Sequence, residues 1–286
     1  MERVRIRVPL HITGFWKPVY TRDPLTTGSL GAGINISSHL VADIMKSDRP
    51  VLYLNDKITH VPTVERVFRY YGKPVIVRAY TDALLGAGYG LSAALALAAS
   101  IGITILYGIR TTIEKAASIA HIAEVEEATG LGDVIAMYYG GFEARVKPGP
   151  PGIGEIVKLP YDPSIRIVTV TLGRYYTASM LREYGVKQYV TADNYLKELL
   201  SYPDLQNFLI LSRSFTKTFF NYDTVERIID QLKRYLIGYY LKKKVLVLAI
   251  EKDYLNDITE YISNRGLKYI ISSISFNGIL IDNIVR

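Results

Sequence analysis

The chain has 286 residues, a formal net charge of +7 and 49% hydrophobic residues, which excludes a disordered protein and predicts one large or two ordinary globular domains. It has no cysteine, which excludes disulfides, zinc–thiolate sites, iron–sulfur clusters and a cysteine nucleophile. The positive charge suits anionic partners, and because it is spread along the chain we expect a small anionic ligand rather than nucleic acid. This composition is compatible with a reducing cytoplasm, where we expect the protein.

The amino-terminal half begins with a strand rather than a signal peptide, because arginines alternate with apolar residues up to Pro9. A loop is expected next, and then the glycine-rich segment 27–33, for which a hairpin or bulge is the ordinary interpretation. Strands are expected over residues 2–8, 51–54, 74–80 and 142–146, and helices over 64–71, 90–107 and from Thr111 or Thr112 to about Gly130.

The segment from Leu85 to Ala94 reads LGAGYGLSAA and joins a predicted strand to a predicted helix. Glycines let a backbone approach a ligand closely, and a helix amino terminus carries unpaired N–H groups and partial positive charge. Together these features indicate a phosphate site. The glycines alternate, so the segment is neither a Walker A loop nor a dinucleotide fingerprint, and tight packing of helix on strand would need the same residues. The Ser92 hydroxyl can cap the helix or bind magnesium.

No residue between Asp82 and Arg110 is charged, and this run is long enough to cross a bilayer. Five glycines interrupt it, and alanine makes up much of the rest. We therefore expect a buried helix after a glycine loop, with a membrane anchor as the alternative.

Two carboxylates follow the loop. Glu124 lies three residues after His121 on the same face of a predicted helix, and it can bind magnesium if the fold brings it to the glycine loop. Asp133 stands between Gly132 and Val134, where an aspartate is usually a turn residue but can also accept a hydroxyl proton in phosphoryl transfer. A phosphate loop, a hydroxyl, a metal carboxylate and a base thus occur in that order.

A Pro/Gly-rich break at residues 147–154 predicts a boundary near residue 160, and thus domains over 1–160 and 161–286. The second part alternates strands and helices, which predicts a small sheet with helices on one face and an α+β protein. Its strands are expected over 166–172, 245–250 and 279–284, and its helices over 177–183, 191–200, 224–241 and 254–264.

The order of these features resembles the GHMP kinases, the superfamily named for galactokinase, homoserine kinase, mevalonate kinase and phosphomevalonate kinase. The segment 86–94 is similar to their central ATP-binding motif, with Ala93 in place of its second serine. Further blocks over 9–33, 120–134 and 140–150 look like archaeal pantoate kinases. The resemblance implies a two-lobed fold, with a mixed sheet and helices in the first lobe and a ferredoxin-like second lobe. It also implies ATP-dependent phosphorylation of the 4-hydroxyl of pantoate in archaeal coenzyme A biosynthesis.

On this interpretation ATP and Mg²⁺ are the cofactors. The ATP phosphates would lie on Gly86, Ala87, Gly88, Tyr89, Gly90, Leu91 and Ser92. Ser92 and Glu124 would hold Mg²⁺, and Asp133 would orient and deprotonate the pantoate hydroxyl. Substrate contacts are expected from His11, Thr13, Ser29, Gly31 and Gly33, with Arg145 as the cation for the substrate carboxylate.

Two alternatives stay open. A sibling kinase acting on mevalonate, homoserine or another small hydroxy acid would use the same phosphate machinery. A nucleotide-binding protein without catalysis would agree with Ala93 and with a degenerate third glycine motif at 272–278, where any role for Ser275 or Gly278 is open. Membrane partners are not expected, and a homodimer is left open.

Overall fold

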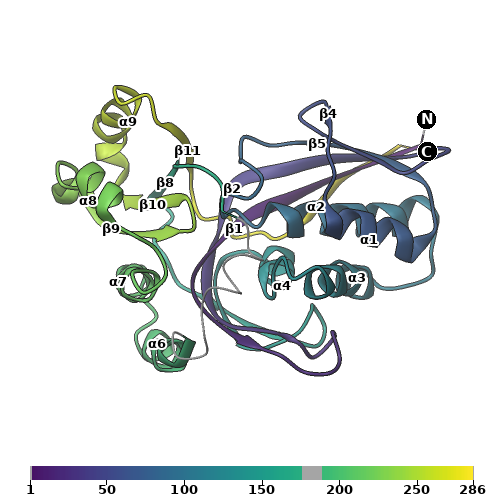
Figure 1. Cartoon of the computed structure of the whole chain (residues 1–286), viewed down its shortest axis with the longest axis horizontal. Coiled ribbons are helices and arrows are strands. Elements are labelled where there is room, and N and C mark those ends of the chain that lie inside the picture. The colour runs from purple at the N-terminus through teal and green to yellow at the C-terminus, as the bar shows by residue number, and fades with distance from the viewer. Residues whose placement is uncertain (1, 176–188, 286) are drawn as a thin grey trace.

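The computed structural model describes residues 2–175 and 189–285, which form two sheets (Figure 1). The larger sheet has eight strands in the order β12-β1-β2-β5-β3-β4, with β6 beside β2 and β7 beside β6. Its strands are β1 (Arg3–Val19), β2 (Gly28–Lys46), β3 (Val51–Leu54), β4 (Lys57–Ile58), β5 (Val75–Tyr80), β6 (Phe142–Lys147), β7 (Glu155–Leu159) and β12 (Leu280–Val285). Because β3 and β5 run parallel and the other pairs antiparallel, the sheet is mixed.

Strands β1 and β2 form one long hairpin, which corrects one expectation and agrees with another. The first strand does not end at Pro9 but continues to Val19, because a register shift at Pro9/Leu10 accommodates the missing N–H. The glycine-rich segment 27–33 runs from Gly28 into β2 and pairs with β1 across a bulge, as the bulge interpretation predicts. A β-carbon on Gly31 would lie 2.2 Å from Phe15 O, so this glycine permits close approach beside the second bulge, at Thr13/Phe15.

Four helices pack against one face of the large sheet (Figure 1): α1 (Pro62–Tyr71), α2 (Leu91–Leu106), α3 (Ile113–Glu126) and α4 (Asp133–Tyr139). Helix α2 contacts β1 and β2 on one side and α1 and α3 on the other, and all its residues from Ala93 to Thr104 are buried. This burial accounts for the uncharged run around α2. Among the described residues, no helix combines the length and the apolar character needed to span a membrane.

The smaller sheet is antiparallel, with the order β11-β8-β10-β9. Its strands are β8 (Arg166–Thr171), β9 (Leu236–Lys242), β10 (Val245–Ile250) and β11 (Lys268–Ser272). When these four strands are numbered along the chain, they lie in the sheet in the order fourth, first, third, second. This is the strand order of a ferredoxin-like lobe. The remaining helices are α6 (Val190–Ser201), α7 (Leu205–Thr216), α8 (Asp223–Ile229) and α9 (Leu255–Ser263), with 3₁₀ turns η2 (Lys233–Tyr235) and η3 (Lys252–Tyr254).

Alternate residues of β10 divide between two hydrophobic cores. Val245 and Val247 join the core that continues into the large sheet, whereas Leu246 and Leu248 pack with residues of α8 and α9. Helices α8 and α9 thus cover one face of the small sheet, as expected. The other face packs against the rest of the molecule.

The helix expected over 224–241 is wrong, because α8 ends at Ile229 and β9 begins at Leu236. An apolar run such as that of β9 has no periodicity that separates strand from helix, and pairing with β10 decides it. The helix expected over 177–183 lies outside the described residues. The division at residue 160 stays a prediction; β12 returns to the large sheet and pairs with β1, which brings the two ends of the chain together (Figure 1).

Candidate active site

The glycine loop before α2 depends on its three alternating glycines. Gly86, Gly88 and Gly90 have φ of 83°, 134° and 66°, a region that side chains disfavour. Gly90 is the N-cap of α2, and no side chain caps this end. The unpaired N–H groups at the start of α2 therefore remain available to an anion.

Other loop residues hold the loop in place rather than facing a ligand. The Tyr89 side chain is buried, and its hydroxyl bonds Thr169 Oγ1 at 3.0 Å and Thr171 Oγ1 at 2.9 Å in the small sheet. Its carbonyl accepts a hydrogen bond from His11 N. Ala87 and Leu91 are also buried, whereas Ser92 in the first turn of α2 is partly exposed.

Buried charges from three elements meet at His11 of β1. Nδ1 lies 2.7 Å from Oδ1 of Asp133, the first residue of α4, and Nε2 lies 3.0 Å from Glu143 Oε1 on β6. Glu143 Oε1 also accepts a hydrogen bond from Arg145 Nη1. These four residues form an alternating row of negative and positive groups, which we call the charge row.

The charge row explains two pKa shifts. Burial alone would lower the pKa of His11, but its hydrogen bonds to Asp133 and Glu143 outweigh that effect and raise it. Burial would likewise raise the pKa of Asp133, but the hydrogen bond and charge of His11, together with the charges of Lys242 and Arg145, lower it to about 2. Asp133 is thus held as a carboxylate, with 23% of its side chain still exposed.

Glu124 of α3 lies in the opposite kind of environment. Its side chain is buried, and among the described residues its Oε2 has no hydrogen-bond partner. Burial and the nearby charge of Asp133 raise its pKa well above the usual value, and Lys243 opposes the rise only in part. A β-carbon on Gly130 would lie 2.6 Å from Glu124 Oε1, so the backbone closes tightly over this carboxyl.

A third group of polar atoms converges beside Gly132, next to Asp133. A β-carbon there would lie 2.4 Å from Ser29 Oγ and 2.7 Å from Arg145 Nε. Within the described part of the chain this buried Nε has no partner. Ser29 and Arg145 therefore present polar atoms to one point beside Asp133.

The remaining expected substrate residues divide into two kinds. Thr13 Oγ1 donates to Asp133 Oδ1 at 3.5 Å, and Gly33 gives His11 and Glu143 room, because a β-carbon there would lie 2.3 Å from His11 Nε2. Gly31 instead faces the backbone of β1. His121 does not pair with Glu124: its Nε2 lies 2.9 Å from Thr27 O and thereby fastens α3 to the loop before β2.

Lysines from the small sheet complete the site, and sequence reasoning did not assign them to it. The charges of Lys242 and Lys243 act on Asp133, and that of Lys243 also acts on Glu124. Together with Lys244 they form the densest run of positive charge in the sequence, and this run could have indicated an anion site. Glu143 gave no such signal, because it is an ordinary acidic residue in a strand.

A cavity of about 710 Å³ lies between β3 and α1. Val51, Leu52, Val61, Val64 and Phe68 give it apolar walls. Next to its Val61 wall, Thr63 Oγ1 donates to Ser92 O at 3.4 Å, which joins α1 to the first turn of α2.

Comparisons with known proteins agree with this arrangement. The family model described as "GHMP kinases N terminal domain" matches residues 58–141, which include the glycine loop, Glu124 and Asp133. The pantoate kinase of Thermococcus kodakarensis is 35% identical over 228 residues, covering 75% of each chain. That of Methanocaldococcus jannaschii is 34% identical over 221 residues, covering 72% of this chain and 77% of its own.

Solved structures show the same fold. A protein described as "Phosphotransferase related to CoA biosynthesis pathway" superposes with a TM-score of 0.86 at 28% identity, over 98% of both chains. Mevalonate-3-kinase from Thermoplasma acidophilum superposes with a TM-score of 0.70 at 14% identity, over 99% of both chains. The two-lobed α+β fold expected from the sequence is confirmed.

Proposed function

The chain belongs to the pantoate kinase family of the GHMP kinases, and we propose that it transfers the γ-phosphoryl group of ATP to the 4-hydroxyl of pantoate. One observation carries the proposal. Asp133 is held as a carboxylate by His11 and keeps part of its side chain exposed, while a β-carbon on Gly90 would lie only 3.3 Å from Asp133 Cγ. A proton acceptor thus stands against the loop that suits phosphate.

Two surfaces of the protein suit the two parts of the nucleotide. The glycines of the loop and the first turn of α2 would take its phosphates, and the apolar cavity between β3 and α1 would take its base. The side chains of Tyr89, Ala87 and Leu91 support the loop from behind, so their part in nucleotide binding is through the backbone.

The donors near the loop suit Mg²⁺. This ion prefers oxygen ligands and usually takes one or two carboxylates together with substrate phosphates. Glu124 offers a buried, unpaired Oε2, and Ser92 offers a hydroxyl at the start of α2. When bound there, the ion would neutralise phosphate charge. Among the described residues no group of three or more His, Cys, Asp or Glu could hold a metal alone, which agrees with a site completed by ATP.

In the proposed step Asp133 accepts the hydroxyl proton as the oxygen attacks the γ-phosphorus. A base of low pKa suffices, because the proton leaves only as the new bond forms. Ser29 Oγ and Arg145 Nε would bind the substrate beside Asp133, with Thr13 at its edge. Arg145 shares its charge with Glu143, so its unpaired Nε is the donor left for the pantoate carboxylate.

Gly31 and Gly33 shape this substrate site through the backbone, and His11 acts through Asp133. Gly278 packs against α4, since a β-carbon there would lie 1.9 Å from Tyr138 O, and we give it and Ser275 no part in nucleotide binding. We propose that its small-molecule partners are ATP and pantoate, without nucleic acid or membrane, and that the protein acts in the cytoplasm.

The test is ADP release by purified protein with Mg²⁺–ATP, measured with pantoate, mevalonate, homoserine or no acceptor. We expect turnover that depends on pantoate, with phosphate on its 4-hydroxyl in the product's phosphorus NMR spectrum. Turnover with another hydroxy acid alone would favour a sibling kinase. ATP binding without turnover on any acid would favour a non-catalytic nucleotide-binding protein.

A further inference from the structure

The turn between β9 and β10 is joined directly to the phosphate loop. Lys244 N donates to Ala87 O at 3.1 Å, and a β-carbon on Gly88 would lie 2.7 Å from Lys242 O. Because any larger residue than glycine at position 88 would collide with this turn, the two segments fit one another at the backbone. The smaller sheet therefore contributes a fixed wall to the phosphate site.

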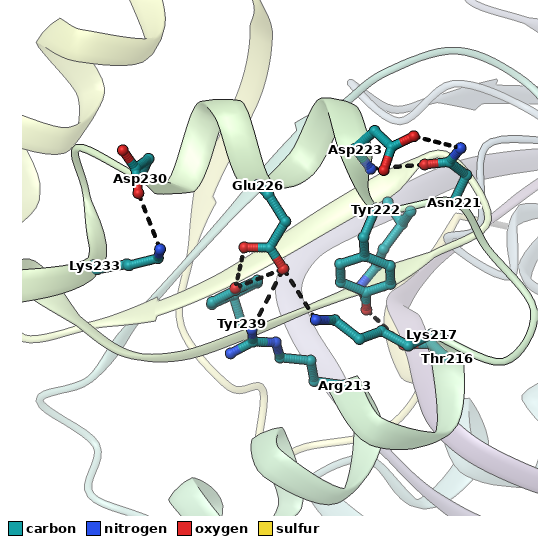
Figure 2. Close-up of polar contacts among 11 residues, drawn as sticks. Arg213, Thr216, Lys217, Asn221, Tyr222, Asp223, Glu226, Asp230, Lys233 and Tyr239 are labelled. Carbon is teal, nitrogen blue, oxygen red and sulfur yellow. Dashed lines mark hydrogen bonds and ion pairs between the residues drawn. The ribbon is translucent and has the colours of Figure 1, made fainter.

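Strand β9, which leads into this turn, is also held in place by side-chain hydrogen bonds. Leu241 N donates to Tyr222 Oη at 2.7 Å, and the same hydroxyl lies 2.7 Å from Thr216 Oγ1. Figure 2 shows Tyr222 directed toward Thr216, beside a separate cluster in which Glu226 contacts Arg213, Lys217 and Tyr239. These contacts tie β9 to α7 and α8, so the position of its last residue, Lys242, is set by packing.

The three successive lysines have different environments. The Lys242 ammonium is buried 3.3 Å from the centre of the Trp16 ring, a cation–π contact. Lys244 is exposed. Lys243 is partly buried, and the charges of Asp133 and Glu124 act on it. Lys243 also has a φ of +55°, a region that usually takes glycine in a two-residue hairpin turn.

This backbone strain indicates that the side chain has a use. A glycine would relax the turn but would leave Asp133 and Glu124 without this positive charge. Burial lowers the pKa of Lys243, and the two carboxylates oppose that shift. A bound triphosphate would add further negative charge, which favours the ammonium form.

We propose that Lys243 binds the transferred phosphoryl group of ATP and stabilises it during transfer. This inference rests on the proposed function. The bond from the acceptor oxygen to phosphorus forms as the bond from phosphorus to the bridging oxygen breaks, and its electron pair leaves with ADP. The acceptor proton passes to Asp133, while Lys243 keeps its protons and neutralises the phosphoryl oxygens. The smaller sheet thereby supplies a catalytic residue to a site built mainly on the larger one.

The experiment compares Lys243→Met, Lys243→Gly and Lys243→Arg with wild type, and uses Lys252→Met as a control that removes an exposed lysine. Lys243→Gly also relaxes the positive φ, so it remains folded even if the methionine variant does not. Thermal melting verifies the fold of each variant. Two quantities are measured: kcat for ADP release, and the ratio of dissociation constants for ADP and the non-hydrolysable AMP-PNP.

We expect Lys243→Met and Lys243→Gly to lower kcat about 100- to 1,000-fold, as when one transition-state donor is removed. They should also reduce the preference for AMP-PNP over ADP by about tenfold. Lys243→Arg should retain most of the kcat and most of the preference for AMP-PNP, and Lys252→Met should match wild type in both quantities. A kcat and a binding preference within about threefold of wild type for the glycine variant would overturn the role of Lys243. If wild type shows no acceptor-dependent turnover, the proposed function fails, and the nucleotide ratio still decides whether Lys243 meets the γ-phosphoryl group.

Discussion

Two carboxylates of the candidate site, Asp133 and Glu124, lie in opposite electrostatic environments. In the charge row, Asp133 is paired with His11, and its pKa falls to about 2. At the end of α3, Glu124 is buried with an unpaired oxygen, and its pKa rises. Carboxylates whose environments separate their pKa values commonly have separate chemical roles. Asp133 has a partner of opposite charge within the protein, whereas Glu124 has an oxygen that a cation would satisfy.

The largest effect should come from Asp133→Asn, which removes the proposed base without changing its size. We expect kcat to fall about 1,000-fold, within the range for loss of a general base, with ATP affinity changed less than about threefold. The measurement is ADP release with pantoate, together with ATP titration calorimetry. Asp230→Asn, which removes an exposed carboxylate paired with Lys233, is the control. Equal losses in both variants would contradict a specific role for Asp133.

Glu124→Gln should weaken the binding of Mg²⁺ rather than impair proton transfer. We expect the Mg²⁺ concentration for half-maximal activity to rise about 10- to 100-fold, because a neutral amide is a weaker ligand.

The same substitution should also stabilise the protein without nucleotide. Because the pKa of Glu124 is raised on folding, the wild type loses stability as pH rises from about 4.5 toward the folded-state pKa. The glutamine variant has no such loss, so its melting temperature should exceed that of wild type at pH 8, by a difference that shrinks toward pH 4. A lower melting temperature at pH 8 would show that Glu124 is satisfied within the protein. Asp133→Asn should shift the melting temperature downward, in the opposite direction.

His11→Gln should give the smallest change in activity and should test the charge row itself. Without the imidazolium, burial dominates and the pKa of Asp133 should rise from about 2, moving the acid limb of kcat upward by about 1–2 pH units. The measurement is the pH profile of kcat.

The same pKa shifts determine how the stability of the folded protein depends on pH. The lowered pKa of Asp133 gives stability that is present above pH 3.8 and lost toward pH 2, and the raised pKa of His11 gives stability that is present below pH 6.5 and lost at higher pH. Both contributions should be reduced in the variant. Adding His11→Gln to Asp133→Asn should leave the acid part of the stability profile unchanged, and a further change there would indicate other partners for His11.

Much of the candidate site could be proposed from the sequence because its signals are local. Alternating glycines, a serine in the first turn of a helix, and two carboxylates at characteristic positions indicate phosphate, metal and base without any long-range information. The resemblance to GHMP kinases added the two-lobed fold, which the structure has. The extent of the first strand and the identity of β9 escaped prediction, because a bulge at Pro9 and pairing with β10 decide them.

By itself, the sequence determined the glycine loop, the buried helix after it and the order of candidate groups, since each depends on neighbours a few residues apart. Only the tertiary structure decided which charges each candidate group meets. His11 meets Glu143 because β2 pairs with both β1 and β6. The charge of Lys243 acts on Asp133 because the β9–β10 turn fits against Gly88. Burial and charge at these long-range contacts lower the pKa of Asp133 and, among the described residues, leave Glu124 Oε2 without a hydrogen-bond partner. Both are properties of the packed interior rather than of any segment.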